Sequence, residues 1–73
     1  IGVFTATGTL TSGSPTFTLS ASNLRIGAGQ LVTGTGVPAN TTVVSIVGTA
    51  VTLSNNATVT GTETLTFDNQ ILV

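Results

Sequence analysis

Three side chains in this sequence of 73 residues carry a formal charge: Arg25, Glu63 and Asp68. Paired carboxylates are the arrangement among them that could perform acid–base chemistry. Glu63 and Asp68 are five residues apart across an expected strand, so they should point to opposite faces of it. No charged neighbour is expected to tune either group. We therefore interpret both as solvated carboxylates near strand ends rather than as a catalytic pair.

Nucleophilic catalysis lacks its usual components in this chain. The sequence contains no His, Cys, Lys or Tyr, so its many Ser and Thr hydroxyls have no conventional base to activate them. Trp is absent as well, which removes the common stacking platforms for carbohydrate ligands. The sequence thus predicts no enzyme activity, no catalytic residue, no cofactor and no small-molecule substrate.

Arg25 is the only cationic side chain, and one guanidinium cannot neutralise several phosphates, so nucleic-acid binding is not expected. Two roles stay open for it: an ion pair with Glu63 or Asp68, within the chain or across a subunit boundary, or a solvated surface position.

Without His or Cys, a zinc site is not expected either. Side-chain oxygens that could contact Ca²⁺ belong to Asn55, Asn56, Asp68 and Asn69. These residues do not form a dense acidic loop, so no metal site is predicted.

The segment 34–40, Gly-Thr-Gly-Val-Pro-Ala-Asn, has the small residues of a phosphate-binding loop. Such a loop leads into a helix that carries Lys or Ser/Thr, whereas a strand is expected here. Gly34 and Gly36 can adopt positive φ, Pro38 fixes φ, and Asn40 tolerates a left-handed conformation. We interpret the segment as a structural bend between strands.

Threonine alternates with Val, Leu, Ile and Phe over much of the chain, which is the period-two pattern of half-buried strands. Strands are expected at residues 3–11, 16–20, 42–47, 50–54 and 64–67. Turn residues at 12–15 and 48–49 should close two hairpins, and one short helical turn is expected within residues 21–27. The pattern predicts a single all-β domain over residues 1–73, either a small antiparallel sandwich or an open barrel of five to seven short strands.

The alternation also predicts which side chains form the core. The inward positions are Phe17, Leu19, Val44, Ile46, Val51, Leu53, Leu65 and Phe67. Val43 and Val47 then fall on the opposite face of the strand at 42–47. Because that strand is apolar on both faces, it should be central in the sheet or pressed against a partner.

Both chain ends are apolar, at residues 1–4 and 70–73, where soluble domains usually have polar residues. We expect at least one end to dock on a neighbouring subunit, as an added strand or at a threefold seam. The alternative is that both are edge strands of the chain's own sheet.

Composition also favours assembly, because a small chain without Cys and with a net charge of −1 has neither disulfides to stabilise it nor charge to keep copies apart. The apolar runs are far too short for a membrane-spanning segment, so no membrane contact is expected.

Three successive segments carry a further pattern. Residues 32–43 read V-x-G-x-G-V-P-x-x-T-x-V, residues 51–58 read V-T-L-S-x-x-A-T, and residues 61–67 read G-T-x-x-L-T-F. Together with the first hairpin, at residues 8–19, they resemble a β-module of tailed-bacteriophage virion proteins, which include tail-fibre-like chains and capsid decoration or head-fibre proteins. The resemblance covers residues 8–67 and implies a location in the virion, a structural role and frequent trimeric assembly.

The function expected from these observations is that of a non-catalytic virion structural protein. It would be a capsid decoration, cement or head-fibre subunit that forms a homotrimer and binds the major capsid protein or other virion proteins through β-rich interfaces. Two alternatives remain: a β domain of a tail fibre or tail spike, and a subunit of a self-polymerising extracellular filament.

Overall fold

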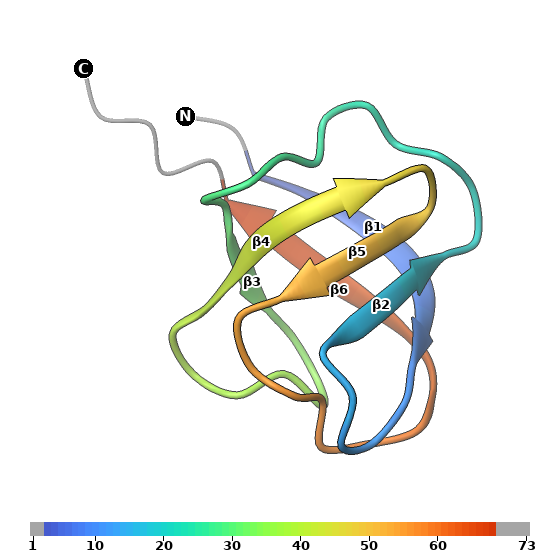
Figure 1. Cartoon of the computed structure of the whole chain (residues 1–73), viewed down its shortest axis with the longest axis vertical. Coiled ribbons are helices and arrows are strands. Elements are labelled where there is room, and N and C mark those ends of the chain that lie inside the picture. The colour runs from blue at the N-terminus through green and yellow to red at the C-terminus, as the bar shows by residue number, and fades with distance from the viewer. Residues whose placement is uncertain (1–2, 69–73) are drawn as a thin grey trace.

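The alternation of threonine with larger apolar residues produces six strands within residues 3–68, the part of the chain that the computed structural model describes. The strands are β1 (Val3–Leu10), β2 (Thr16–Leu19), β3 (Leu31–Thr33), β4 (Thr41–Val47), β5 (Ala50–Leu53) and β6 (Gly61–Asp68). Each pairs antiparallel with its neighbours, and they close into a barrel in the order β1-β2-β5-β4-β3-β6 (Figure 1). The prediction of a small antiparallel all-β fold is confirmed.

Both predicted hairpins are present. Strands β1 and β2 pair with Leu10 opposite Phe17, and β4 and β5 are joined by Gly48 and Thr49, with Val47 opposite Ala50. Gly48 has a φ of 59°, which suits a tight two-residue connection because such turns match the twist of the flanking strands.

The short helical turn expected within residues 21–27 is wrong. The connection between β2 and β3 contains hydrogen-bonded turns instead of a helix. The side-chain oxygen of Asn23 accepts a hydrogen bond from the backbone N–H of Arg25 at 2.9 Å. Such a bond also occurs at helix N-termini, but here it accompanies one isolated turn, in which the N–H of Ile26 donates to the carbonyl of Asn23 at 3.4 Å, and Ile26 then packs into the core.

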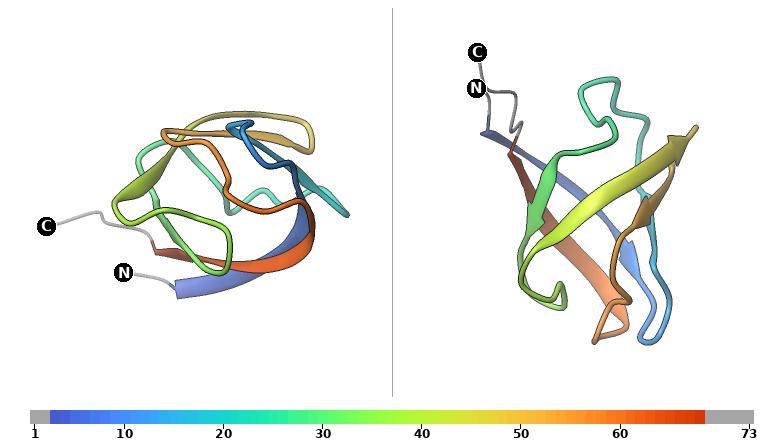
Figure 2. Two further views of the ribbon diagram at one scale, coloured as in Figure 1. Left: turned by 90° about the horizontal axis from the view of Figure 1, so that it is seen from below. Right: turned by 60° about the vertical axis from the view of Figure 1, so that its left-hand side comes forward.

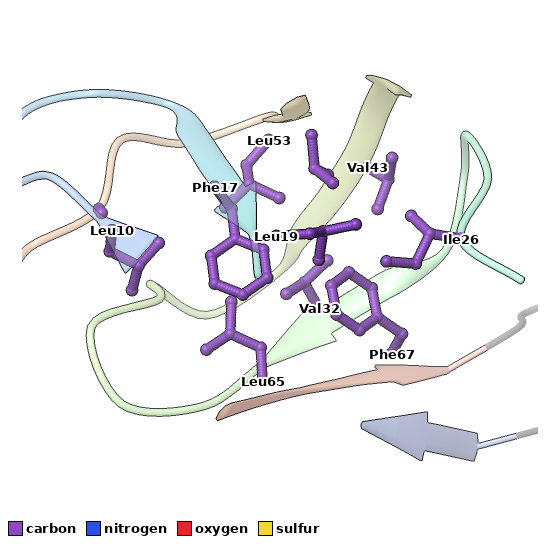
Figure 3. Packing of buried hydrophobic residues seen from close by; sticks show 11 residues of the cluster. Leu10, Phe17, Leu19, Ile26, Val32, Val43, Leu53, Leu65 and Phe67 are labelled. Atoms are coloured by element: carbon purple, nitrogen blue, oxygen red, sulfur yellow. The ribbon is translucent and has the colours of Figure 1, made fainter. Parts of the chain in front are cut away.

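The barrel interior is filled by eleven buried apolar side chains, most of which Figure 3 labels. Six of the predicted core residues are among them, namely Phe17, Leu19, Val51, Leu53, Leu65 and Phe67. The core also contains five residues that the alternation did not identify: Leu10, Ile26, Val32, Val43 and Ala57. Phe67 lies at the centre of an aromatic cluster, with its ring centroid 5.6 Å from that of Phe4 and 6.2 Å from that of Phe17.

The predicted inward orientation of Val44 is wrong. Val44 is 54% exposed, while Val43, expected on the outer face, is 2% exposed. The register between β4 and β5 shifts between Val43 and Ser45, and an irregularity of this kind inserts one residue and reverses the alternation on one side of it. Beyond the shift the prediction is correct, because Ile46 packs against the core and Val47 faces outward.

The barrel has two different ends. The upper end, as drawn in Figure 1, is where β1, β3 and β5 begin and where β2, β4 and β6 end. It also carries the β2–β3 connection and the β4–β5 hairpin. The lower end carries the other three loops, at residues 11–15, 34–40 and 54–60. The two further views in Figure 2 show the same separation.

Backbone hydrogen bonds join the three loops of the lower end to one another. Ala57 accepts from the N–H of Gly13 at 2.8 Å and donates to the carbonyl of Ser14 at 2.9 Å, and Thr58 donates to the carbonyl of Gly36 at 2.9 Å. The lower end is therefore closed by a connected set of loops.

Candidate functional site

The two carboxylates do not form a site together. Glu63 and Asp68 both lie on β6, and their five-residue spacing within one continuous strand puts them on opposite faces, as predicted. Glu63 lies opposite Gly8 of β1, whereas Asp68 lies opposite Val3 at the upper end. The arrangement matches two separate strand positions rather than an acid–base pair.

The oxygens considered for Ca²⁺ are also kept apart. Asn55 belongs to a lower-end loop, where its amide donates to the hydroxyl of Thr41 at 3.1 Å, and Asn56 follows it in the same loop. Asp68 ends β6 at the opposite end of the barrel, and Asn69 lies outside the described residues. Residues 3–68 contain no cluster of three or more His, Cys, Asp and Glu side chains.

Arg25 has a partner that the sequence analysis did not consider. Its guanidinium carbon lies over the ring of Phe4, 4.6 Å from the centroid, which is the geometry of a cation–π contact. The sequence analysis considered an intrachain ion pair with Glu63 or Asp68. The interaction that the structure shows for the Arg25 side chain is the contact with Phe4. It fastens the β2–β3 connection to the first strand at the upper end.

The glycine-containing segment at 34–40 is built as a bend, as predicted. Gly34, Gly36 and Asn40 have φ values of 147°, 86° and 62°, and strand β4 follows directly. A side chain at Gly36 would run into Val59, so the space above this glycine is filled by the neighbouring loop. The segment therefore packs against protein and does not leave an open cradle.

A buried amide holds the β2–β3 connection in shape. Gln30 is 7% exposed, and its side chain accepts from the N–H of Gly27 at 3.0 Å and donates to the carbonyl of Arg25 at 2.7 Å. Its backbone carbonyl accepts from Val43 of β4 at 2.9 Å. Because Ile26 in the same connection belongs to the core, the segment is anchored from both sides.

Apolar side chains are exposed at the upper end of the barrel. Leu24, in the β2–β3 connection, is 99% exposed, Val47 at the end of β4 is 77% exposed, and Val3 at the start of β1 is 65% exposed. Val44 is exposed lower on β4. The alternation pattern correctly placed Val47 on the outer face, but it did not identify Leu24 as exposed. The one indication in the sequence was that Leu24 is a single leucine among polar residues.

A groove lies beside Leu24. It has a volume of about 260 Å³ and lies between the β2–β3 connection and the β4–β5 hairpin, lined by Ser22, Asn23, Leu24, Ile26, Ile46 and Gly48. Ile26 and Ile46 are core or core-contacting residues, so the inner part of the groove is apolar. None of its lining residues is ionisable, which suits an uncharged apolar occupant.

The described residues thus define a closed, six-stranded antiparallel β-barrel that has exposed apolar side chains and a groove without ionisable lining residues at one end. No protein-family model matches the sequence, and no curated protein matches it. No helix that could cross a membrane occurs in the part of the chain that the structure describes.

Proposed function

We propose that this chain is a non-catalytic structural protein of a bacteriophage virion. In this proposal it is a capsid decoration, cement or head-fibre subunit, it assembles as a homotrimer, and it binds the major capsid protein. The observation that carries the proposal is the exposure of Leu24 beside the groove and of Val47 at the end of the strand that borders it, with Val3 exposed on the opposite side of the same end. Large exposed apolar side chains grouped on one face are typical of protein–protein contact surfaces.

Charge and topology support the same function. With three ionisable side chains and a net charge of −1, the chain has little electrostatic repulsion to oppose association with its own copies. The resemblance of residues 8–67 to phage virion modules supports the location in a particle. An adhesive subunit needs a rigid body with a contact surface, and a closed barrel with one apolar end supplies both.

The closed sheet favours this proposal over the filament alternative. A filament that grows by strand completion needs an unpaired sheet edge to receive the strand of the next subunit. Within residues 3–68 every strand has neighbours on both sides, so contact through side-chain surfaces is the better-supported mode of assembly.

Particle composition tests the proposal. An antibody against the purified chain should detect it in virions banded by density from a lysate of the source culture, at a fixed ratio to the major capsid protein. A ratio near one copy per capsid protein supports a decoration subunit, while a few copies per particle support the tail-fibre alternative. Banded particles that lack the chain would refute a virion role.

A further inference from the structure

The groove at the upper end is large enough for two aliphatic side chains. A dry cavity of about 150 Å³ lined by aliphatic residues accommodates a benzene molecule, and this groove measures about 260 Å³. Its inner surface comes from Ile26 and Ile46, and Leu24 stands at its rim. An occupant should therefore present at least two apolar side chains and no charged side chain.

The groove is preorganised. Gln30 pins the backbone on both sides of Ile26 through its hydrogen bonds to Gly27 and Arg25. The guanidinium of Arg25 is directed onto Phe4. Because these contacts already order the β2–β3 connection, little conformational entropy remains to be lost when an occupant binds.

The chain itself contains a segment with the required chemistry. After β6 ends at Asp68, the sequence continues Asn69-Gln70-Ile71-Leu72-Val73. Residues 71–73 are three consecutive apolar side chains, and the two amides before them are uncharged. Five residues span about 17 Å when extended. Strand β6 ends at the upper end of the barrel (Figure 1), the end whose β2–β3 connection and β4–β5 hairpin line the groove.

Topology favours the groove of another copy over the groove of the same copy. In the ring of six strands, β6 is three positions from β5 and two from β4, so it lies across the barrel from the hairpin that borders the groove. The β2–β3 connection crosses between them, with Ile26 packed in the core (Figure 2). The β2–β3 connection therefore separates the end of β6 from the groove of the same copy, which favours the groove of a neighbour as the site for the residues after Asp68.

We propose that residues 71–73 of one copy occupy the Leu24–Ile46 groove of a second copy. The inference rests on the self-assembly in the proposed function and identifies the surfaces that perform it. Each copy supplies one segment and one groove, so the contact is heterologous, and contacts of this kind form a closed ring when the rotation between copies closes. The number of three copies is that of the homotrimer in the proposed function. A ring of three would join the upper ends of the barrels around one axis.

Two full-length variants test the contact from each side. Leu24→Asp damages the groove, and Leu72→Asp damages the segment. Because Leu24 is 99% exposed, its substitution should leave the far-ultraviolet circular dichroism unchanged. Its urea midpoint should equal that of the unmodified chain at concentrations where both are monomers, since assembly shifts apparent stability. Ala39→Asp adds the same charge at an exposed position of the lower end and is the matched control.

Light scattering over a concentration series gives the readout. The unmodified chain and Ala39→Asp should form trimers, while each of the other two variants should dissociate at concentrations about thirtyfold higher, the loss typical of a contact hot spot. A mixture of Leu24→Asp with Leu72→Asp should form heterodimers, because the first retains an intact segment and the second an intact groove.

The results that overturn the inference differ from those that overturn the proposed function. Trimers that persist in either variant would place the interface elsewhere and leave a virion role intact. A chain that is monomeric at every concentration would also refute occupancy by a second copy. The composition of banded particles decides the virion role independently of both results.

Discussion

Substitution of Gly36 by alanine tests whether the lower end of the barrel is closed in solution as it is in the structure. Gly36 has a φ of 86°, and a Cβ built there would overlap Cγ2 of Val59 and lie 3.2 Å from Cδ1 of Leu10. Gly13 is a matched control, because its φ is 84° and a Cβ there would meet nothing within 4 Å. Both substitutions therefore put an alanine at a positive φ, but only Gly36→Ala also brings a Cβ into collision with Val59.

The expected losses of stability follow from this difference. A non-glycine residue in the left-handed region costs about 1–2 kcal/mol, which should apply equally to Gly13→Ala and Gly36→Ala. Overpacking costs about a further 1–3 kcal/mol for Gly36→Ala alone. In a domain of this size each kcal/mol lowers the melting temperature by about 4–8 °C, so Gly36→Ala should melt at least about 4 °C below Gly13→Ala.

Thermal unfolding and urea unfolding, both followed by circular dichroism, measure the two variants, at one protein concentration because assembly shifts apparent stability. A second substitution, Val59→Ala, removes the colliding methyl group and should recover most of the extra loss of Gly36→Ala in a double-mutant cycle. Equal midpoints for Gly13→Ala and Gly36→Ala, or a Val59→Ala substitution that adds its full cost to Gly36→Ala, would refute the close approach of the two loops.

Three further contacts are tested by substitution in the same unfolding assay. Arg25→Gln and Phe4→Leu should show a coupling of about 0.5–1 kcal/mol in a double-mutant cycle, the size of an exposed cation–π contact; strictly additive effects would exclude the contact. Thr41→Val should cost about 1–3 kcal/mol, because this hydroxyl is fully buried and donates to a backbone carbonyl at 2.7 Å. Thr18→Val, at an exposed position of β2, should change stability by less than about 0.5 kcal/mol, and equal effects for the two threonines would contradict the burial. Gly8→Ala should cost about 1–3 kcal/mol, since its Cβ would overlap the backbone carbonyl oxygen of Thr18 and lie 2.8 Å from an aromatic carbon of Phe17; an unchanged midpoint would contradict the close approach of β2 to this glycine.

Local sequence was sufficient to predict the all-β class, both tight hairpins and six of the core positions. These features depend on neighbouring residues. A period-two pattern places Phe17 and Leu19 on one face of β2 wherever that strand lies, and the Gly48-Thr49 pair favours a two-residue turn in any sheet. The positive φ values at Gly34, Gly36 and Asn40 were likewise predicted from residue type.

The candidate contact surface was not predictable in the same way. Leu24 is exposed because Asn23 and Gln30 form hydrogen bonds that hold the connection around it, and the second of these residues is placed by its pairing with β4. Nothing in the run Ser-Asn-Leu-Arg distinguishes an exposed leucine from a buried one. The cation–π contact of Arg25 was missed for a related reason, since Phe4 lies far away in the sequence.

Tertiary contacts also determined the orientation of Val43 and Val44 and the closure of the sheet. The register shift in β4 exists only because β5 pairs beside it, and one shifted residue exchanges the buried and exposed faces. Closure depends on β6 pairing with both β1 and β3, two strands that are distant from it in the sequence. Alternation within a strand states which residues share a face, but only pairing with distant strands selects which of the two faces is buried.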